Sequence, residues 1–361
     1  MLSSKFAVIC ALALPLAAQV PMIIDDDCST DYCPVVAPFK LWDQGKITVL
    51  AFIADTTDTY AAPTFRVHSM YYQHATVPVY ANQQNTPNNA NCTTNSCNGP
   101  RANQATLIST FNPGDTKANY TDCLTGYRTI LAANTNVVIV ATGFATCLYQ
   151  LMTSSADGIS SLTGAQLIQA NVSKLVLCCG ENPTGSEWNF ENDPVDWNYL
   201  FANWTSQNGY PPIWMFSDAD ASGTAFGPPA YALSTVNTEL KQWLLYGFTT
   251  RPVWDEATVF LAYCGLACGG TTYWADAGNG TMTVNSAVNT PINGQAMGYN
   301  SWSTGTASGH HYVTNVASAT VLSHLFDGYS YGFGFAALPP LANTGSMGNG
   351  GVAFNGGMTV Q

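Results

Sequence analysis

The sequence predicts an α/β protein with a mostly parallel central sheet that helices cover on both faces. Short apolar segments rich in Val and Ile alternate with longer segments of helical character, and this alternation is typical of parallel strands joined by helices. The chain has 361 residues, 47% of them hydrophobic, and a chain of this size can bury one large core. We therefore expect one large α/β domain, followed by a small C-terminal β-region and a Gly/Asn-rich tail.

Six segments have the length and composition of strands. They lie at residues 22–24, 47–53, 77–80, 137–141, 175–179 and 213–216. Six further segments are predicted helices. They lie at residues 35–43, 64–74, 120–132, 144–152, 193–204 and 235–246. The segment 82–116 is rich in Asn, Pro and Thr, and it predicts a long loop.

The character of the chain changes after Gly265. Residues 271–274 and 311–316 predict short strands, and residues 318–326 predict a helix, so we expect an appended β-region of the same domain. Residues 338–361 carry no charge and are rich in Gly and Asn, and they predict a flexible tail or an extended segment that adds to a sheet edge. If that edge belongs to a neighbouring molecule, the tail would assemble a homo-oligomer.

The first residues are typical of a secretory signal peptide. Lys5 precedes an apolar run at residues 6–18, and Ala17 and Ala18 provide small residues for cleavage. Because this run is too short to cross a bilayer, we expect no membrane span. The predicted organisation is a signal peptide at 1–18, a main domain at 19–337 and a low-complexity tail at 338–361, in a secreted, extracellular protein.

The cysteines predict disulfide bonds. Removal of residues 1–18 takes away Cys10 and leaves ten of the eleven cysteines, an even number in an oxidising compartment. The simplest pairs are Cys28 with Cys33, Cys92 with Cys97, and Cys264 with Cys268. For the adjacent Cys178 and Cys179, bonds to Cys147 or Cys123 are favoured over a bond between the two. Zinc is less favoured, because these pairs have no His nearby.

The surface must be polar without being highly charged, because charged residues make up only 9% of the chain. N-glycans would add polarity at five Asn-x-Ser/Thr sequons. These are Asn91, Asn119, Asn171, Asn203 and Asn279. The net charge of −12 and the total of ten Lys and Arg argue against a nucleic-acid partner and favour cations.

An acidic segment follows the first predicted strand. Asp25, Asp26 and Asp27 stand at the end of the strand, and Asp31 follows shortly after. Ligands of parallel sheets collect at the carboxyl ends of the strands, and the alternation of side chains aims Asp25 and Asp27 the same way. Two carboxylates about 4 to 5 Å apart repel by roughly 1 to 4 kcal/mol, so a cation or a shared proton must offset the repulsion. Calcium prefers such oxygen ligands. The alternative is a solvated acidic loop or a helix cap.

The histidine pair and most of the tryptophans are expected to have structural rather than catalytic roles. His310 and His311 are expected as a surface pair on a polar strand rather than as metal ligands. Four tryptophans are expected in the core, namely Trp197, Trp204, Trp274 and Trp302.

Five segments in the same order along the chain resemble motifs of the inosine/uridine-preferring nucleoside hydrolases. Residues 21–27, Pro-Met-Ile-Ile-Asp-Asp-Asp, resemble the family's amino-terminal aspartate motif. The others are residues 138–143, residues 174–180, residues 187–190 with 193–194, and residues 251–255, which end in Trp-Asp. The resemblance spans roughly residues 21–330 and implies a divergent, secreted member with a nucleoside-hydrolase-like fold.

The resemblance implies calcium-assisted hydrolysis of an N-ribosidic bond. The implied partner is a nucleoside, which would be the substrate. The implied calcium ligands are Asp25, Asp27, Thr142 and Asp255, and Asp27 is also the implied base for the attacking water. The implied substrate-binding residues are Asp31, Glu187, Asn189 and Trp254, of which Trp254 would stack on the base.

The chain departs from the family pattern. Where the family has paired aspartates, this chain has Asp31 and Tyr32, or Cys33 and Pro34 in the longer alignment, so at least one carboxylate is missing. Asp55 lies in the motif that usually carries Asn, and no His precedes Asp255. Losing one charged ligand weakens a calcium site, although an extracellular medium can still saturate a site of millimolar affinity.

Two functions remain open. The first is a secreted nucleoside hydrolase, a glycosidase that acts with calcium. The alternative is a catalytically degenerate relative that serves as an extracellular structural or self-assembling glycoprotein. The missing aspartate, the sequons and the uncharged tail favour the alternative.

Overall fold

The computed structural model describes residues 19–28, 35–84, 102–178, 180–216, 225–226, 251–252, 254–287, 298–305 and 308–317. Several predicted features therefore lie outside the described residues. They are the signal peptide at 1–18, the helices at 235–246 and 318–326, the tail at 338–361, Asp31, Asn91, Cys33, Cys92, Cys97 and Cys179.

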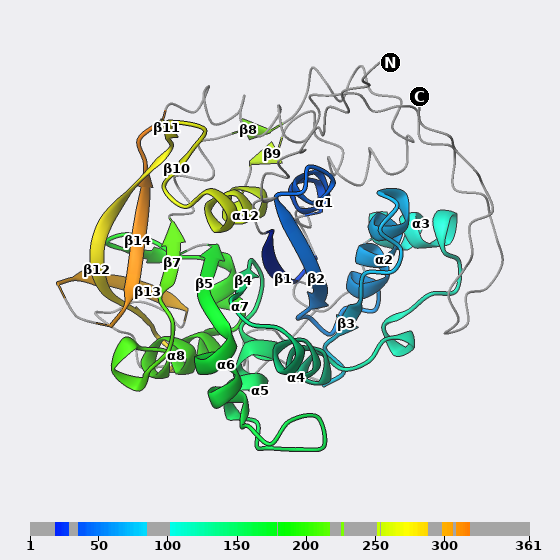
Figure 1. Cartoon of the computed structure of the whole chain (residues 1–361), viewed down its shortest axis with the longest axis horizontal. Coiled ribbons are helices and arrows are strands. Elements are labelled where there is room, and N and C mark those ends of the chain that lie inside the picture. Colours follow the sequence, from blue (N-terminus) through cyan, green and yellow to red (C-terminus); the bar gives the residue numbers. More distant parts are fainter. Residues whose placement is uncertain are drawn as a thin grey trace, which may run out of the picture.

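A ten-stranded sheet forms the centre of the described chain, in the order β3-β2-β1-β4-β5-β7-β14-β12-β13-β6 (Figure 1). Neighbouring strands from β3 to β14 are parallel, and β12, β13 and β6 continue the sheet in antiparallel pairing. The strands are β1 (Val20–Asp26), β2 (Ile47–Ala54), β3 (Val79–Ala81), β4 (Val137–Ala141), β5 (Val172–Cys178), β6 (Thr184–Ser186), β7 (Ile213–Phe216), β12 (Trp274–Val284), β13 (Tyr299–Thr304) and β14 (His310–Asn315). Two short pairs lie outside it, β8 (Ala225–Phe226) with β9 (Arg251–Pro252) and β10 (Ala267–Cys268) with β11 (Thr271–Thr272).

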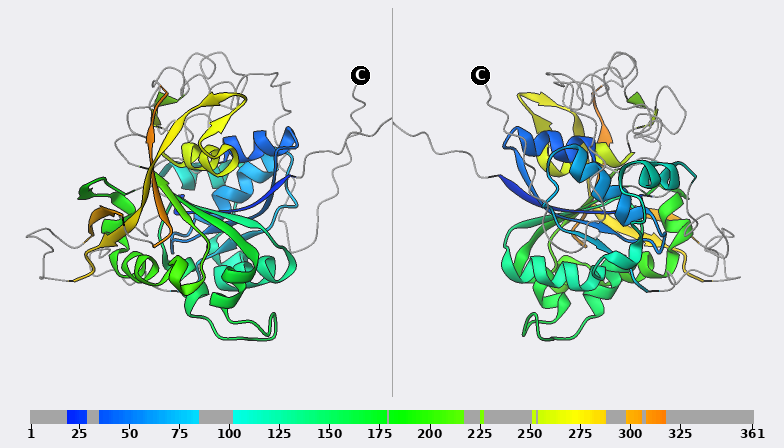
Figure 2. Two further views of the ribbon diagram at one scale, coloured as in Figure 1. Left: turned by 60° about the vertical axis from the view of Figure 1, so that its left-hand side comes forward. Right: turned by 90° about the vertical axis from the view of Figure 1, so that its right-hand side faces the viewer.

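Helices cover both faces of the sheet, as Figures 1 and 2 show. One core cluster packs α1 (Val36–Asp43), α2 (Ala61–Tyr71), α3 (Ala102–Phe111) and α12 (Trp254–Cys264) against one face. The other packs α4 (Cys123–Ala133), α5 (Thr146–Thr153), α6 (Gly164–Asn171), α7 (Trp188–Asn192) and α8 (Pro194–Asn203) against the opposite face. Short 3-10 turns form at η1 (Lys117–Asn119) and η2 (Ser206–Asn208).

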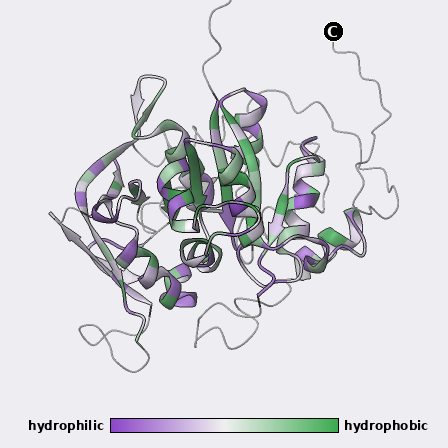
Figure 3. Ribbon diagram, turned by 60° about the horizontal axis from the view of Figure 1, so that its bottom comes forward, coloured by the Kyte–Doolittle hydropathy of each residue, from purple (hydrophilic) through white to green (hydrophobic). Residues whose placement is uncertain are grey.

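The side-chain alternation of β1 supplies both clusters. Met22 and Ile24 belong to the first cluster and Ile23 to the second, so consecutive residues of this strand point to opposite faces. The hydrophobic residues gather in the strands at the middle of the molecule (Figure 3). The α/β fold class with a mostly parallel sheet is therefore confirmed.

The structure agrees with the predicted type of an element, helix or strand, more often than with its predicted first and last residues. The strands at 137–141 and 213–216 have the predicted bounds. The helix predicted at 64–74 begins earlier, at Ala61, because Pro63 fits the first turn of a helix, where no N–H donor is needed. The long loop predicted at 82–116 was wrong in part, since it contains α3.

The predicted C-terminal β-region is present and belongs to the same domain, as expected. β14 pairs in parallel with β7, so this part of the chain continues the central sheet. The expectation of a surface pair at His310 and His311 was half wrong. His310 is fully buried, and its Nε2 lies 2.8 Å from the carbonyl oxygen of Trp204, whereas His311 is partly exposed and its Nδ1 lies 2.9 Å from Asp276. The four tryptophans expected in the core are buried.

Two disulfides lie within the described chain. Cys264 bonds to Cys268, as predicted. Cys123 bonds to Cys147, which corrects the expectation that one of these two pairs with Cys178 or Cys179. Cys28 and Cys178 are also disulfide-bonded. Within the described ranges, no helix combines the length and the apolar character that crossing a bilayer requires.

Candidate functional site

The candidate site lies where three parallel strands end together. β1 ends with Asp25 and Asp26, and Asp27 follows. Asp55 comes directly after β2, and Thr142 comes directly after β4. Backbone N–H groups of Asp55 and Thr142 donate to the carbonyl oxygens of Asp26 and Asp25, at 3.2 and 2.9 Å, so the sheet pairing holds the three strand ends in register. All four aspartates are buried.

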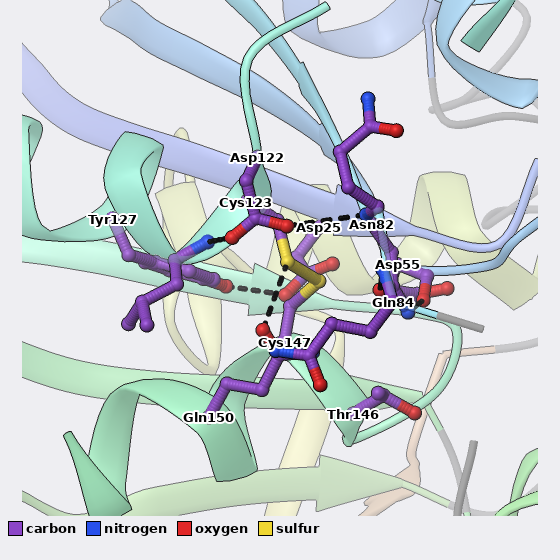
Figure 4. The surroundings of a disulfide bond; sticks show 12 residues. Asp25, Asp55, Asn82, Gln84, Asp122, Cys123, Tyr127, Thr146, Cys147 and Gln150 are labelled. Carbon is purple, nitrogen blue, oxygen red and sulfur yellow. Dashed lines mark hydrogen bonds between the residues drawn. A yellow bond between two sulfur atoms is a disulfide. The ribbon is translucent and has the colours of Figure 1, made fainter. Parts of the chain in front are cut away.

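Asp25 points towards the face that α4 covers. Its Oδ2 accepts a hydrogen bond from the hydroxyl of Tyr127, and the carboxyl group of Asp55 lies close to it. No protein hydrogen bond reaches its Oδ1. Burial raises the pKa of Asp25 to about 7, and the polar interactions with Tyr127 and Asp55 oppose this shift. Figure 4 shows Asp25 between Tyr127 and Asp55, next to the Cys123–Cys147 disulfide.

Asp55 shares this buried environment. Its Oδ2 accepts a hydrogen bond of 2.7 Å from the backbone N–H of Phe144, and the Asn82 side chain donates to its carbonyl oxygen at 2.7 Å. Its Oδ1 has no protein hydrogen bond. Burial raises the pKa of Asp55 well above its usual value, and the neighbouring charges of Asp25 and Asp27 raise it further. The two carboxyl groups therefore require a proton or a cation between them.

Gly143 makes this close approach sterically feasible. A Cβ atom at this position would lie 2.3 Å from the backbone nitrogen of Asp27 and 2.3 Å from Oδ2 of Asp55. Real Cβ atoms essentially never approach other atoms so closely, so any larger residue would displace Asp27 or Asp55.

Asp26 points to the opposite face and stabilises the strand ends. Its Oδ2 accepts a hydrogen bond from the hydroxyl of Thr142 at 2.8 Å, and its Oδ1 accepts one from the backbone N–H of Cys28 at 2.7 Å. Cys28 has a left-handed φ of 49° and is disulfide-bonded, so the chain turns sharply directly after Asp27. A cystine therefore adjoins the acidic cluster.

Asn189 reaches the same strand end, whereas Glu187 is held by a helix. The side-chain amide of Asn189 donates to the carbonyl oxygen of Thr142 at 3.1 Å, the carbonyl that the resemblance assigns to calcium. The two carboxylate oxygens of Glu187 accept the backbone N–H groups of Asn189 and Phe190, each at 3.0 Å. Glu187 thus caps the start of α7.

The other expected site residues come from α12. Trp254 and Asp255 lie in its first turn, where Asp255 is buried and Trp254 partly exposed. α12 packs against β4, β5 and α1. Across the residues described, no three His, Cys, Asp or Glu side chains are arranged as a group that could hold a metal ion. The structure thus brings Asp25, Asp27, Thr142 and Asn189 together but does not close the full calcium ligand set.

The site nevertheless offers a donor set of the right chemistry. Two buried carboxyl oxygens, on Asp25 and Asp55, have no protein hydrogen bond, so a proton or a cation would satisfy them. Oxygen ligands of this kind suit calcium better than zinc or copper.

Sequence reasoning missed the roles of Asp55, Asn82 and Tyr127. Asp55 and Asn82 follow predicted strands, so the argument applied to Asp25 would have identified both. Tyr127 carries no such signal, because its helical spacing resembles that of any core residue. Among the sequons, Asn119 and Asn279 are exposed, and Asn171 and Asn203 are partly exposed.

No protein-family model and no curated protein matches the sequence. Solved structures do match. A plant nucleoside hydrolase aligns with a TM-score of 0.59 at 13% identity, covering 86% of this chain and 99% of its own. An inosine-guanosine nucleoside hydrolase aligns with a TM-score of 0.59 at 15% identity, covering 87% and 99%. The effector protein XOO4466 aligns with a TM-score of 0.63 at 14% identity, covering 87% and 93%.

At such low identity these similarities concern the fold alone. They include nucleoside hydrolases, which align with this chain over nearly their whole length. This chain has the nucleoside-hydrolase fold.

Proposed function

We propose that this protein hydrolyses the N-ribosidic bond of nucleosides with the help of calcium. One observation carries the proposal: buried carboxylates with unpartnered oxygens, on Asp25 and Asp55, stand next to Asp27 at the carboxyl ends of the central strands. In an α/β sheet this edge is the usual place for ligands.

The chemistry assigns roles to these residues. Cleavage passes through a state with positive charge on the ribose, and nearby carboxylates stabilise such charge. Asp27 would take the proton from the attacking water, and Asn189 would orient the ribose near the Thr142 carbonyl. Asp31, Glu187 and Trp254 remain the proposed further contacts to the nucleoside.

Asp25, Asp27, the carbonyl oxygen of Thr142 and Asp255 would hold the calcium. When bound, the ion would supply the positive charge that offsets the repulsion among the carboxylates and lowers the pKa of water. Cation binding would also stabilise the fold, since it favours the native state by mass action.

A product assay tests the proposal. The secreted protein is incubated with purine and pyrimidine nucleosides, and free ribose is measured with calcium and with a chelator. We expect ribose release that the chelator abolishes and that Asp276→Asn, a carboxylate change on β12, leaves unchanged. Absence of ribose from every nucleoside in excess calcium would refute the proposal.

Three observations favour the second candidate, a non-catalytic extracellular glycoprotein. Among the described residues, no three potential ligand side chains are arranged to hold a metal ion. Glu187 caps a helix, and the disulfide-bonded Cys28 adjoins the aspartates. This candidate predicts a folded protein whose melting temperature does not respond to calcium. It also predicts self-assembly that deletion of residues 338–361 abolishes in light scattering, and a calcium-stabilised monomer that releases ribose would count against it.

A further inference from the structure

The helix α1 begins without a local cap. Val35 precedes α1, makes no side-chain cap hydrogen bond, and no acidic residue lies in the first turn. The first backbone N–H groups of a helix have no partner within the helix, and a buried helix start needs acceptors from elsewhere. α1 follows the acidic end of β1, so its start lies close to the candidate site in sequence.

Glu256 of α12 supplies the acceptors. Its Oε1 accepts the backbone N–H of Val36 at 3.0 Å, and its Oε2 accepts that of Ala37 at 2.9 Å, across 220 and 219 residues of sequence. The side chain is 1% exposed. Both bonds are charge-assisted when the carboxylate is ionised, and the positive end of the helix dipole strengthens them.

This contact joins the start of α1 to the helix whose first residues the proposed function assigns to the site. Glu256 lies in the same helical turn as Trp254 and Asp255, the α12 residues to which the proposed function gives roles at the site. α1 continues from the segment that begins with Asp27. One carboxylate therefore fixes the start of α12 relative to the start of α1.

Capping a helix with a buried carboxylate from a distant helix costs desolvation free energy. α4 and α6 are capped by local side chains, Asp122 and Thr163, which need no buried charge from another helix. A buried carboxylate must lose its hydration, so Glu256 stabilises the helix start only through good geometry. The feature that a local cap would not provide is the fixed relation between α1 and α12.

We propose that Glu256 is a positioning residue of the candidate site, which locks α12 to the start of α1 and so holds Asp255 and Trp254 in place for the substrate. This inference rests on the proposed function. Glu256 itself touches neither nucleoside nor cation in this account.

The test compares Glu256→Gln with Thr163→Ala. Glu256→Gln keeps the shape of the side chain but replaces one of its two acceptor oxygens by an NH2 group, whereas Thr163→Ala removes a helix cap far along the sequence from the site. We expect both variants to lower the melting temperature, but only Glu256→Gln to lower kcat/KM for a nucleoside, by at least tenfold and mainly through a higher KM. A kcat/KM within twofold of wild type for Glu256→Gln would overturn the proposal and leave a structural cap only.

Hydrogen exchange separates this inference from the proposed function. If the wild type hydrolyses no nucleoside, the proposed function fails. Hydrogen exchange still tests whether Glu256 holds the start of α12 against the start of α1. Faster exchange in Glu256→Gln at both Val36–Ala37 and the first turn of α12 would support it, and faster exchange at Val36 and Ala37 alone would contradict it. Should Glu256→Gln not fold, Glu256→Asp, which keeps the charge but shortens the side chain, is measured for the same two outcomes.

Discussion

The carboxyl groups of Asp25 and Asp55 couple this protein's stability to pH. Both are buried and close to each other, and one oxygen of each has no protein hydrogen bond. The folded-state pKa of Asp25, about 7, lies above its usual value of 3.8. The neutral carboxyl group therefore contributes stability that is fully present below pH 3.8 and is lost as the pH rises through about 7.

Asp55→Asn tests this coupling. The amide is neutral, keeps an acceptor for the N–H of Phe144 and can donate to Oδ1 of Asp25. Without added cation, we expect the wild type to lose stability between pH 5 and pH 8, by up to about 1.4 kcal/mol per pH unit for each proton lost. Asp55→Asn should lose less stability than the wild type over this pH range and should have the higher melting temperature at pH 8. Thermal melts in a chelating buffer measure both, and an unchanged pH slope in Asp55→Asn would contradict the account.

Residue types at strand ends could be predicted, but their partners could not. Asp25 and Asp27 were predicted to point the same way because side chains alternate along a strand, and Asp25 indeed points opposite to Asp26, towards Tyr127. The capping role of Glu187 depends on where α7 starts, and α7 was not predicted. Glu256 was not predicted either, since its partners lie 220 residues away.

At the scale of elements, the α4–α5 pair supports the site. The Cys123–Cys147 disulfide joins the first turns of these two helices, and Tyr127 lies one turn beyond Cys123. The disulfide thereby helps to fix the hydroxyl of Tyr127 where it donates its hydrogen bond to Asp25. The disulfide thus stabilises the fold and orients a side chain of the site.

Replacing both cysteines tests this role. Cys123→Ala with Cys147→Ala opens a loop with a sequence separation of 24, and loop entropy predicts a loss of about 3 kcal/mol in the free energy of unfolding. Cys264→Ala with Cys268→Ala, with a separation of only 4, should lose about 2 kcal/mol by the same relation. Urea unfolding measures both losses. A smaller loss for the first pair than for the second would show that this disulfide does not brace the helices.

Element types were predictable where apolar residues form an uninterrupted run, as in β4 and β7. The helices α3, α6 and α12 were missed for different reasons. α3 lies in an Asn- and Thr-rich stretch, and α6 has a capping box, Thr163 with Gln166, that went unnoticed. The acidic Trp-Asp-Glu start of α12 was interpreted as part of a motif rather than as a first helical turn, where acidic residues are favourable.

At the scale of the whole molecule, the fold class and the parallel part of the sheet followed from the alternation of strands and helices. The extension of the sheet by β14, β12, β13 and β6 did not, because pairing between distant strands is not encoded in local periodicity. The low content of charged residues also concerns the whole surface, and it is the basis of the expected glycans.

Secretion and glycosylation remain predictions with a direct test. We expect the secreted protein to begin after residue 18 and to carry N-glycans, foremost at the exposed Asn119 and Asn279. Intact mass before and after enzymatic deglycosylation should fall, and Asn119→Gln and Asn279→Gln should each remove one glycan mass. A mature protein that keeps residues 1–18 or shows no mass change would contradict this expectation.

The most direct measurement compares kcat for ribose release by the wild type and by Asp27→Asn, on the best nucleoside at saturating calcium. Asn keeps the size of the side chain but cannot accept the proton of the attacking water. We predict measurable turnover by the wild type and a reduction of at least 100-fold in Asp27→Asn. Equal rates in the two proteins, or no turnover by a correctly folded wild type, would contradict a nucleoside hydrolase built on this acidic strand end.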